Sequence, residues 1–198
     1  MPYCTVGSHR RALDLYAFTG GQFVVREDIR AYLRKDLSNE EGVMPVQQGS
    51  LELLNDPTAK ELLQSTIPAR LAYIDTDGAP RVVPIWFHWN GREMVMASPP
   101  KAPKVKALRK NPKVAVTIDD NNFPHRVLML RGVVRLEEVD DLVPEYALAA
   151  ERYFGREQGQ AWVSQLREKN LGGVRIAITP QWVGLLDFKT RFPSAISG

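Results

Sequence analysis

The stretch RVVPIWFHWNGREMVMASPPKAPKVKALRKNPKVAVTID, residues 81–119, decides the fold because it joins strands, turns, a basic loop and a helix start in one run. Residues 81–89 are rich in β-branched and aromatic side chains, and residues 93–97 resume an extended apolar pattern. The pair Asn90-Gly91 between them favours a tight type I′ turn. The sequence therefore predicts a hairpin over residues 81–97.

A proline-rich basic loop follows this hairpin. Its prolines exclude a continued strand, and Pro103 has the fixed φ that suits the first turn of a helix, so a helix is predicted over residues 104–110. Lys101 and Lys104 then lie at the positive end of that helix, which is unfavourable by roughly 0.3–1 kcal/mol per charge unless an anion is present. Together with the Ser98 hydroxyl they predict a phosphate site, with a solvated basic loop as the alternative.

Composition indicates an ordinary soluble globular protein. The chain has 198 residues, 44% apolar and 25% charged, which suits one domain with extensions. Its net charge of +3 permits phosphorylated ligands but is low for a nucleic-acid binder. A single cysteine, Cys4, excludes an internal disulfide and CxxC metal sites and fits a reducing compartment. No apolar run approaches the ~18 residues of a membrane span. We therefore expect a cytoplasmic protein that does not bind a membrane.

The remaining pattern predicts a small barrel behind an N-terminal extension. Residues 1–43, with one short helix near residues 27–35, differ in character from residues 44–198 and are interpreted as an extension or accessory arm. Asp56-Pro57 marks a helix start within a helical region ending near Ser65. Strands are predicted over residues 69–74, 81–89, 93–97, 114–118, 125–136, 174–178 and 182–188. The first three are expected to form a meander.

Two helices are predicted between the last strands. Residues 140–155, with Asp140 and Asp141 as N-terminal acids and Gly155 as C-cap, and residues 158–169 have helical spacing. Gly132 within the strand 125–136 indicates a bulge or a close backbone approach. Six or seven antiparallel strands with short helices predict a mainly β protein that closes into a barrel, because closure removes exposed edges.

Residues 51–192 resemble the FMN-binding split-barrel family of pyridoxamine 5′-phosphate oxidase-like proteins, which includes relatives that use the deazaflavin coenzyme F420. The segments that carry the resemblance are Ala-Arg-Leu-Ala at 69–72 before Asp-Thr-Asp-Gly, Arg-Val-Val-Pro-Ile-Trp-Phe at 81–87, Ala-Ser at 97–98 and residues 104–115. The resemblance implies a split barrel that binds FMN, or alternatively F420. It further implies an oxidoreductase moving a hydride between that cofactor and a small organic substrate.

The resemblance also assigns cofactor-binding residues. The backbone of Arg81, Val82, Val83 and Pro84 would run along the pyrimidine edge of the ring, and Ala97 and Ser98 with Lys104 would hold the phosphate. Where family members have Ser and Arg before that lysine, this chain has Ala102 and Pro103, so Lys101 is predicted to replace the arginine. The catalytic chemistry would come from the cofactor, so no catalytic side chain is assigned.

Assembly and substrate follow from the same resemblance. It implies a homodimer with cofactor sites at the subunit interface, where Trp86, Trp89, Trp182 and Phe188 would line the cleft or, more simply, pack in the core. The oxidase proper holds pyridoxal phosphate with a C-terminal arginine and histidine. This tail has Arg191 without a nearby histidine, so a relative with another substrate is expected.

The sequence also allows three other interpretations. The basic residues from Lys101 to Lys113 would make a nucleic-acid strip, but aromatic residues for base stacking are absent from the loop, so no nucleic-acid partner is expected. A non-catalytic flavin or tetrapyrrole binder remains an alternative to an enzyme. His9, His88 and His125 lack the spacing of a metal site, so no metal is expected.

Overall fold

The computed structural model describes residues 16–19, 22–25, 46–169 and 172–189, and the chain divides into two units, Met1–Pro45 and Val46–Gly198. In the first unit, strands β1 (Tyr16–Thr19) and β2 (Gln22–Val25) pair antiparallel, with Tyr16 opposite Val25. The sequence did not predict this hairpin. The helix predicted near residues 27–35, the N-terminal histidine His9 and the tail arginine Arg191 lie outside the described residues.

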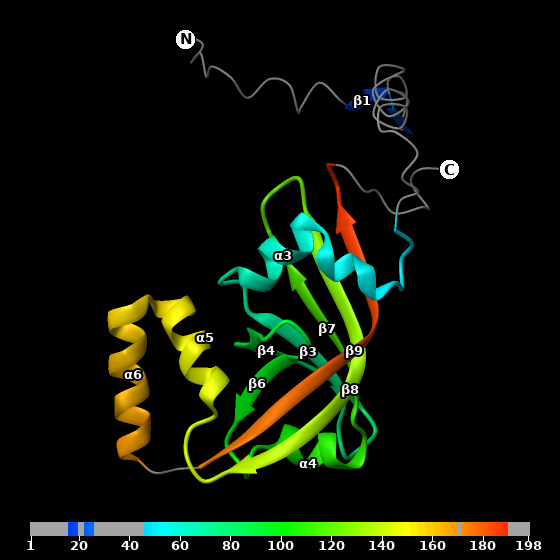
Figure 1. Cartoon of the computed structure of the whole chain (residues 1–198). Coiled ribbons are helices and arrows are strands. Elements are labelled where there is room, and N and C mark those ends of the chain that lie inside the picture. The colour runs from blue at the N-terminus through cyan, green and yellow to red at the C-terminus, as the bar shows by residue number, and fades with distance from the viewer. Residues whose placement is uncertain (1–15, 20–21, 26–45, 170–171, 190–198) are drawn as a thin grey trace, which may run out of the picture. The chain divides into compact units, whose positions relative to one another are not determined.

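The second unit is built on a seven-stranded antiparallel sheet with the order β4-β3-β7-β8-β9-β6-β5. The strands are β3 (Ala69–Ile74), β4 (Pro80–Ile85), β5 (His88–Trp89), β6 (Met94–Ser98), β7 (Lys113–Asp119), β8 (Arg126–Val139) and β9 (Gly173–Asp187). Five helical segments accompany them: η1 (Leu51–Asn55), α3 (Pro57–Gln64), α4 (Pro103–Lys110), α5 (Pro144–Phe154) and α6 (Arg156–Glu168). In Figure 1, α3 and α4 lie at opposite ends of the sheet, and α5 and α6 stand together at its side. The predicted mainly β architecture is confirmed.

The hairpin predicted over residues 81–97 is wrong. Strand β4 pairs with β3 at one edge of the sheet, whereas β5 and β6 form a separate hairpin at the other edge, so the first strands are not a meander. Only Trp86 and Phe87 separate β4 from β5 in the chain. Both are strong strand formers, and their side chains pack instead of extending a ladder: Phe87 is fully buried in the core. The two edge strands β4 and β5 do not pair with each other, which leaves the barrel split.

The turn between β5 and β6 differs by one residue from the expected type I′ turn. The Asn90 amide donates to the Glu93 carbonyl, so Gly91 and Arg92 are the central residues. Gly91 has φ of 93°, and glycine at the first central position is typical of a type II′ turn. The Asn90 side chain closes the loop by accepting from the amides of Arg92 and Glu93.

The long strands β8 and β9 confirm the irregularity predicted at Gly132 and join the last two predicted strands into one. Their register shifts between Arg131 and Gly132, and a Cβ on Gly132 would lie 2.3 Å from the Thr179 carbonyl oxygen. Arg131 lies opposite Trp182 and Gly132 opposite Pro180, so the extra residue of the bulge is Gln181 of β9, and Gly132 is the site of the close backbone approach.

The strands predicted at 174–178 and 182–188 are one strand, in which Pro180 directly precedes this bulged residue. There the ladder is already interrupted, so the missing N–H of the proline is tolerated.

Prolines and a glycine set the helix boundaries. Asp56 caps α3 as predicted, its carboxylate accepting from the Thr58 amide at 2.8 Å. The helix expected from Asp140 begins at Pro144, because proline suits the first helical turn. Gly155, with φ of 84°, separates α5 from α6 as expected, and α6 then begins at once with Arg156.

The core of the barrel is formed by inward-facing residues of all the longer strands, closed at its ends by α3 and α4. Its largest members include Leu71, Met96, Leu128, Leu130 and Ile176, joined by Leu62 and Leu63 of α3 and Val105 and Leu108 of α4. Among the described helices, none is long and apolar enough to cross a membrane.

Candidate functional site: an anion site at α4 beside a free sheet edge

Ser98 ends β6 with a hydroxyl that lacks a partner. The residue is 4% exposed, and its Oγ has no hydrogen bond to any described residue. Because side chains alternate along a strand, Ser98 shares the inward face of β6 with Met94 and Met96, whereas Ala97 packs on the outer side near Val95. An unsatisfied buried hydroxyl costs about 1–3 kcal/mol, so this position favours a ligand that supplies an acceptor.

The start of α4, four residues further on, lacks the side-chain hydrogen bond that usually caps a helix N-terminus. Ala102 occupies the N-cap position and provides no side-chain hydrogen bond, and Pro103 follows at the first helical turn. The Ala102 amide donates to the Pro99 carbonyl and the Val105 amide to the Ala102 carbonyl, which leaves the Lys104 amide as the free N–H of the first turn. This amide and the helix dipole favour an anion.

Lys104 adds a cation to this helix start. Its side chain is half-buried, and burial lowers the pKa of its ammonium group. No carboxylate in the described part of the chain forms an ion pair with it. Lys101, in the preceding loop, is exposed. An unpaired hydroxyl, an uncapped helix and an unpaired ammonium therefore occur within seven consecutive residues, 98–104.

The edge strand β4 presents a short row of free backbone groups. In the β3–β4 hairpin the Asp75 amide donates to the Ala79 carbonyl, which fixes the alternation along the ladder. Arg81, Val83 and Ile85 accordingly direct their backbone groups to β3. Pro80, Val82 and Pro84 direct theirs outward, where no described strand pairs with β4.

This free edge is rich in acceptors and poor in donors. Both prolines lack an N–H, so the amide of Val82 is the one backbone donor on the outward side of β4, beside the carbonyls of Pro80, Val82 and Pro84. Val82 is 63% exposed, which leaves this edge accessible. The Arg81 guanidinium is held by Asp77 at 2.8 Å and Asp75 at 3.4 Å, so its side chain is engaged at the turn.

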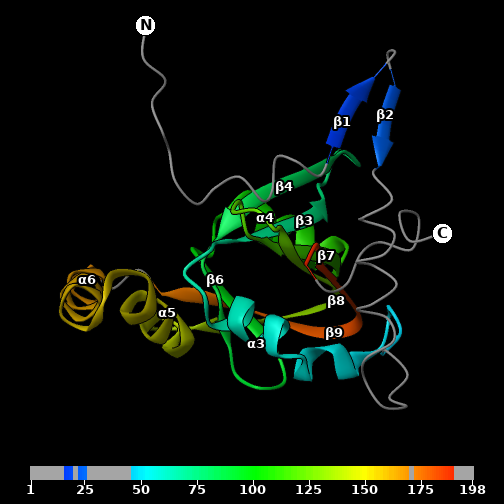
Figure 2. The same ribbon diagram turned by 90° about the horizontal axis from the view of Figure 1, so that it is seen from above.

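Helix α4 lies next to the β3–β4 hairpin. It packs against β3, which Figure 2 shows beside β4, and the Lys110 ammonium donates to the Thr76 carbonyl in the β3–β4 turn at 3.3 Å. Arg109 forms an ion pair with Glu138. Helix α4 thus contacts β3 and the β3–β4 turn. Lys110 and Arg109, two of the basic residues that a nucleic-acid strip would need, are engaged within the chain.

Helix α5 holds the link between the two sheet edges, which sequence reasoning missed. Arg152 donates to the carbonyls of Leu63 and Phe87, and its guanidinium lies 4.6 Å from the centre of the Phe87 ring. Trp86 stacks on Tyr153 with ring centres 4.7 Å apart and an interplanar angle of 8°. The conformation of the link after β4 is therefore set by α5. Only the aromatic composition of residues 146–154 signals this contact.

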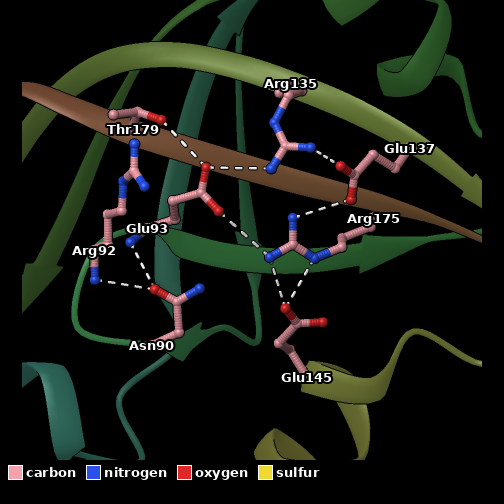
Figure 3. A network of polar contacts seen from close by, with 8 residues as sticks. All are labelled: Asn90, Arg92, Glu93, Arg135, Glu137, Glu145, Arg175 and Thr179. Atoms are coloured by element: carbon pink, nitrogen blue, oxygen red, sulfur yellow. Dashed lines mark hydrogen bonds and ion pairs between the residues drawn. The ribbon is translucent and has the colours of Figure 1, made fainter.

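A network of ion pairs fixes the other end of α5 to the sheet. Arg175 of β9 bonds to Glu145 in the first turn of α5 at 2.6 and 2.8 Å and to Glu137 at 3.2 Å, and it reaches Glu93 at 3.4 Å (Figure 3). Burial acts to raise the pKa of Glu145, but its hydrogen bonds with Arg175 outweigh this and hold the pKa below its usual value. Burial likewise acts to raise the pKa of Glu93, but its hydrogen bond and charge interaction with Arg135, and then those with Arg175, hold this pKa below its usual value.

The other aromatic and histidine candidates have neighbours within the chain. The Arg131 guanidinium lies over the Trp182 ring, 4.1 Å from the ring centre. Phe188 and His125 contact each other edge-on, with ring centres 6.0 Å apart. Burial, and then the charge of Arg152, lower the pKa of His88. Over the described ranges, no group of three or more His, Cys, Asp and Glu side chains is placed to hold a metal.

Trp89 lines a groove apart from the α4 site. The groove has a volume of about 440 Å³ and lies between α3 and the β5–β6 turn. Its lining is mixed, with apolar residues from η1 and α3 and polar residues Asn55, Lys60 and Gln64. None of the predicted cofactor-binding residues contributes to it.

Comparison with known proteins places the fold. A solved structure named F420 reductase has 27% identity, covers 63% of this chain and 94% of its own, and has a TM-score of 0.52. A conserved hypothetical protein of Mycobacterium tuberculosis has 20% identity, coverage of 75% and 92%, and a TM-score of 0.55. No curated protein matches.

A family model decides the membership. The model described as pyridoxamine 5′-phosphate oxidase matches residues 56–187, which include the free edge of β4, Ser98, the α4 site and both long strands. This span is more than half of the chain. The chain therefore belongs to the pyridoxamine 5′-phosphate oxidase family.

Proposed function

We propose that this protein is an oxidoreductase that binds a flavin-type cofactor, with the phosphate at the start of α4 and the ring along the free edge of β4. The observation that carries the proposal is the buried Ser98 hydroxyl without a partner, next to an uncapped helix and the unpaired Lys104. The similarity to a protein named F420 reductase supports the same class of cofactor.

The residues present fit a phosphate group. Phosphate oxygens accept from a hydroxyl, from a free helix N–H and from an ammonium, which are the groups offered by Ser98, the first turn of α4 and Lys104. Ala102 and Pro103 offer no side-chain donor. Lys101 is proposed to supply a second charge from the loop, as a point charge without the bidentate geometry of arginine.

The ring would rest on backbone groups. The Val82 amide and the carbonyls of Val82 and Pro84 suit the alternating acceptors and donor of a flavin pyrimidine edge, and Arg81 and Val83 anchor the strand to β3. Ala97, packed on the outer side of β6, supports the strand end that carries Ser98.

A bound flavin or deazaflavin supplies the hydride-transfer chemistry, and the chain contributes binding, orientation and exclusion of water. FMN and coenzyme F420 are both candidates. A second copy of the chain is proposed to complete the site as a homodimer, and a small organic molecule to be the substrate, in the cytoplasm. A barrel with a filled core leaves little room for a cofactor inside, which favours a site between subunits.

The test is the identity and retention of the ligand. Protein purified from its native source is expected to release a compound with a flavin or deazaflavin absorbance spectrum and mass. Lys104→Met should lower the affinity for that compound about tenfold or more, because a charged hydrogen bond is worth about 1.5–3 kcal/mol. Lys106→Met, an exposed neighbour on the same helix, is the matched control.

Two results would contradict the proposal. One is a protein that binds neither FMN nor F420 at micromolar concentration while remaining folded. The other is equal loss of affinity in the Lys104 and Lys106 variants, which would indicate general electrostatic attraction in place of a built site. Reduction of the bound cofactor by a substrate or a nicotinamide donor separates an enzyme from a carrier.

A further inference from the structure

The groove between α3 and the β5–β6 turn contains none of the predicted cofactor-binding residues, and its lining suits a ligand of its own. We propose that it binds a small aromatic carboxylate, with the carboxylate group at Lys60 and the ring against Trp89. In Figure 1, α3 and α4 lie at opposite ends of the sheet, so this groove is at the end away from the anion site.

Two helical segments and an edge strand form the walls of the groove. Its volume of about 440 Å³ is that of a small-molecule site. Residues three and four apart share one face of a helix, and both η1 and α3 line the groove with residues at this spacing. They include Leu51 and Leu54 of η1 and Lys60 and Gln64 of α3, and Trp89 of β5 closes the third side.

The apolar part of the lining is accessible to a ligand. Leu63 of α3 is fully buried in the core and fixes one wall. Leu51 is 49% exposed, and Leu54 and Trp89 are half-buried. In the described part of the chain, no aromatic ring or guanidinium stacks on the Trp89 ring. An aromatic ligand gains ring–ring contact there in addition to the burial of apolar area, which favours it over an aliphatic one.

The polar part of the lining consists of side chains that the rest of the chain leaves free. Among the described residues, no side-chain hydrogen bond or ion pair involves Asn55, Lys60 or Gln64. Lys60 is the single charged residue of the lining, which matches a ligand with one negative charge. A carboxylate accepts from an ammonium and from an amide N–H, which Lys60 and Gln64 offer from the same helix face.

The C-terminal end of α3, which by itself would repel an anion, is neutralised within the chain. The Leu63 carbonyl accepts from the Arg152 guanidinium at 3.3 Å, and the Leu62 carbonyl accepts from the amide and the hydroxyl of Ser65. Arg152 forms no ion pair with a carboxylate of the described residues. Its positive charge behind Leu63 therefore adds to that of Lys60.

Three probes of one shape separate the contributions of charge and ring. They are 2-naphthoate, its uncharged amide 2-naphthamide and the saturated acid decahydro-2-naphthoate. In ligand-observed NMR titrations of the purified full-length protein, 2-naphthoate should bind with a dissociation constant of about 1 mM or below. The amide should bind about two- to fivefold more weakly, because an exposed ion pair contributes little. The saturated acid should bind about threefold or more weakly.

Substitutions in α3 test the position of the carboxylate. Lys60→Met should abolish the preference for 2-naphthoate over its amide, and Gln64→Glu should weaken 2-naphthoate about two- to fivefold through like-charge repulsion while the amide binds as before. Both residues are exposed, so the variants should fold, and thermal unfolding checks this. Lys106→Met, at an exposed lysine of α4 outside the groove, is the matched control and should keep the preference.

Three results would overturn the assignment of this groove. One is no binding of 2-naphthoate at about 10 mM. Another is a preference for the acid that survives Lys60→Met, or equal binding of the saturated acid. The third is a loss of flavin or deazaflavin affinity in Lys60→Met, because a separate site should leave that affinity unchanged. Failure of the wild type to bind either cofactor would contradict the proposed function and leave the groove unaffected.

Discussion

Replacing Arg175 by Gln should destabilise the protein by about 3 kcal/mol at neutral pH. The Arg175 side chain is 12% exposed and holds Glu145 and Glu93, which are 17% and 14% exposed. Removing one partner from a buried ion pair costs about 3–5 kcal/mol, because the remaining charge stays desolvated, and this partial exposure places the effect at the lower end. For a folded domain of about 150 residues, this loss of unfolding free energy corresponds to a fall of about 6–12 °C in Tm.

The destabilisation by Arg175→Gln should also depend on pH in a defined direction. The folded-state pKa of Glu145 lies below its usual value through Arg175, so its stabilising contribution is complete above about pH 4.3 and is lost as the pH falls through the folded pKa. Without Arg175, burial acts on Glu145 in the opposite direction and favours the protonated form. The difference in unfolding free energy between wild type and Arg175→Gln should therefore be largest near pH 7 and shrink toward pH 4.

Urea denaturation at several pH values measures this difference, and Arg135→Gln is the matched control. Arg135 is 56% exposed and bonds to Glu93 at 3.4 Å, so its loss should cost less than about 1 kcal/mol. The reasoning would be refuted by a cost for Arg175→Gln no larger than that of the control, or by a difference that grows as the solution is acidified.

Two further substitutions give opposite signs of stability change. Ser98→Ala removes a buried hydroxyl without a partner, so the unfolding free energy of the ligand-free protein should rise by about 1 kcal/mol in thermal unfolding. Titration should at the same time show weaker binding of the cofactor. A loss of stability would mean that the hydroxyl has a partner in the folded protein. Gly132→Ala places a Cβ 2.3 Å from the Thr179 carbonyl oxygen, so chemical denaturation should show an unfolding free energy lower by about 1–3 kcal/mol. An unchanged denaturation midpoint would contradict the close approach of the two strands at Gly132.

Local signals were enough wherever one residue type dictates the backbone. Such features depend on the fixed φ of proline, the freedom of glycine or a side-chain cap. They are the helix start at Asp56-Pro57, the helix predicted over residues 104–110 and found over 103–110, the close backbone approach at Gly132 and the Gly155 boundary. The same holds for the alternation in β7. These features are encoded within a few residues, so they are readable without a partner in space.

Pairing between strands was not readable in the same way. Residues 81–97 have strand propensity throughout, and the sequence carries no mark at Trp86 and Phe87 where β4 ends and β5 joins the opposite edge. The division depends on Arg152 and Tyr153, more than sixty residues later in the chain, which hold the link in place. Likewise, Pro180 suggests a strand break in the sequence, but β9 continues through it because the unpaired residue Gln181 beside it already interrupts the ladder.

The features of the proposed site also separate into those that the sequence predicts and those that depend on the tertiary structure. The sequence by itself determined the basic loop, the helix start behind Pro103 and the candidate residues Ser98 and Lys104, since these follow from local chemistry. Only the tertiary structure decided that the Ser98 hydroxyl is buried without a partner and that β4 is a free edge with Val82 as its donor. Burial and pairing depend on residues distant in the chain, because desolvation and hydrogen bonding are set by what surrounds a group in space.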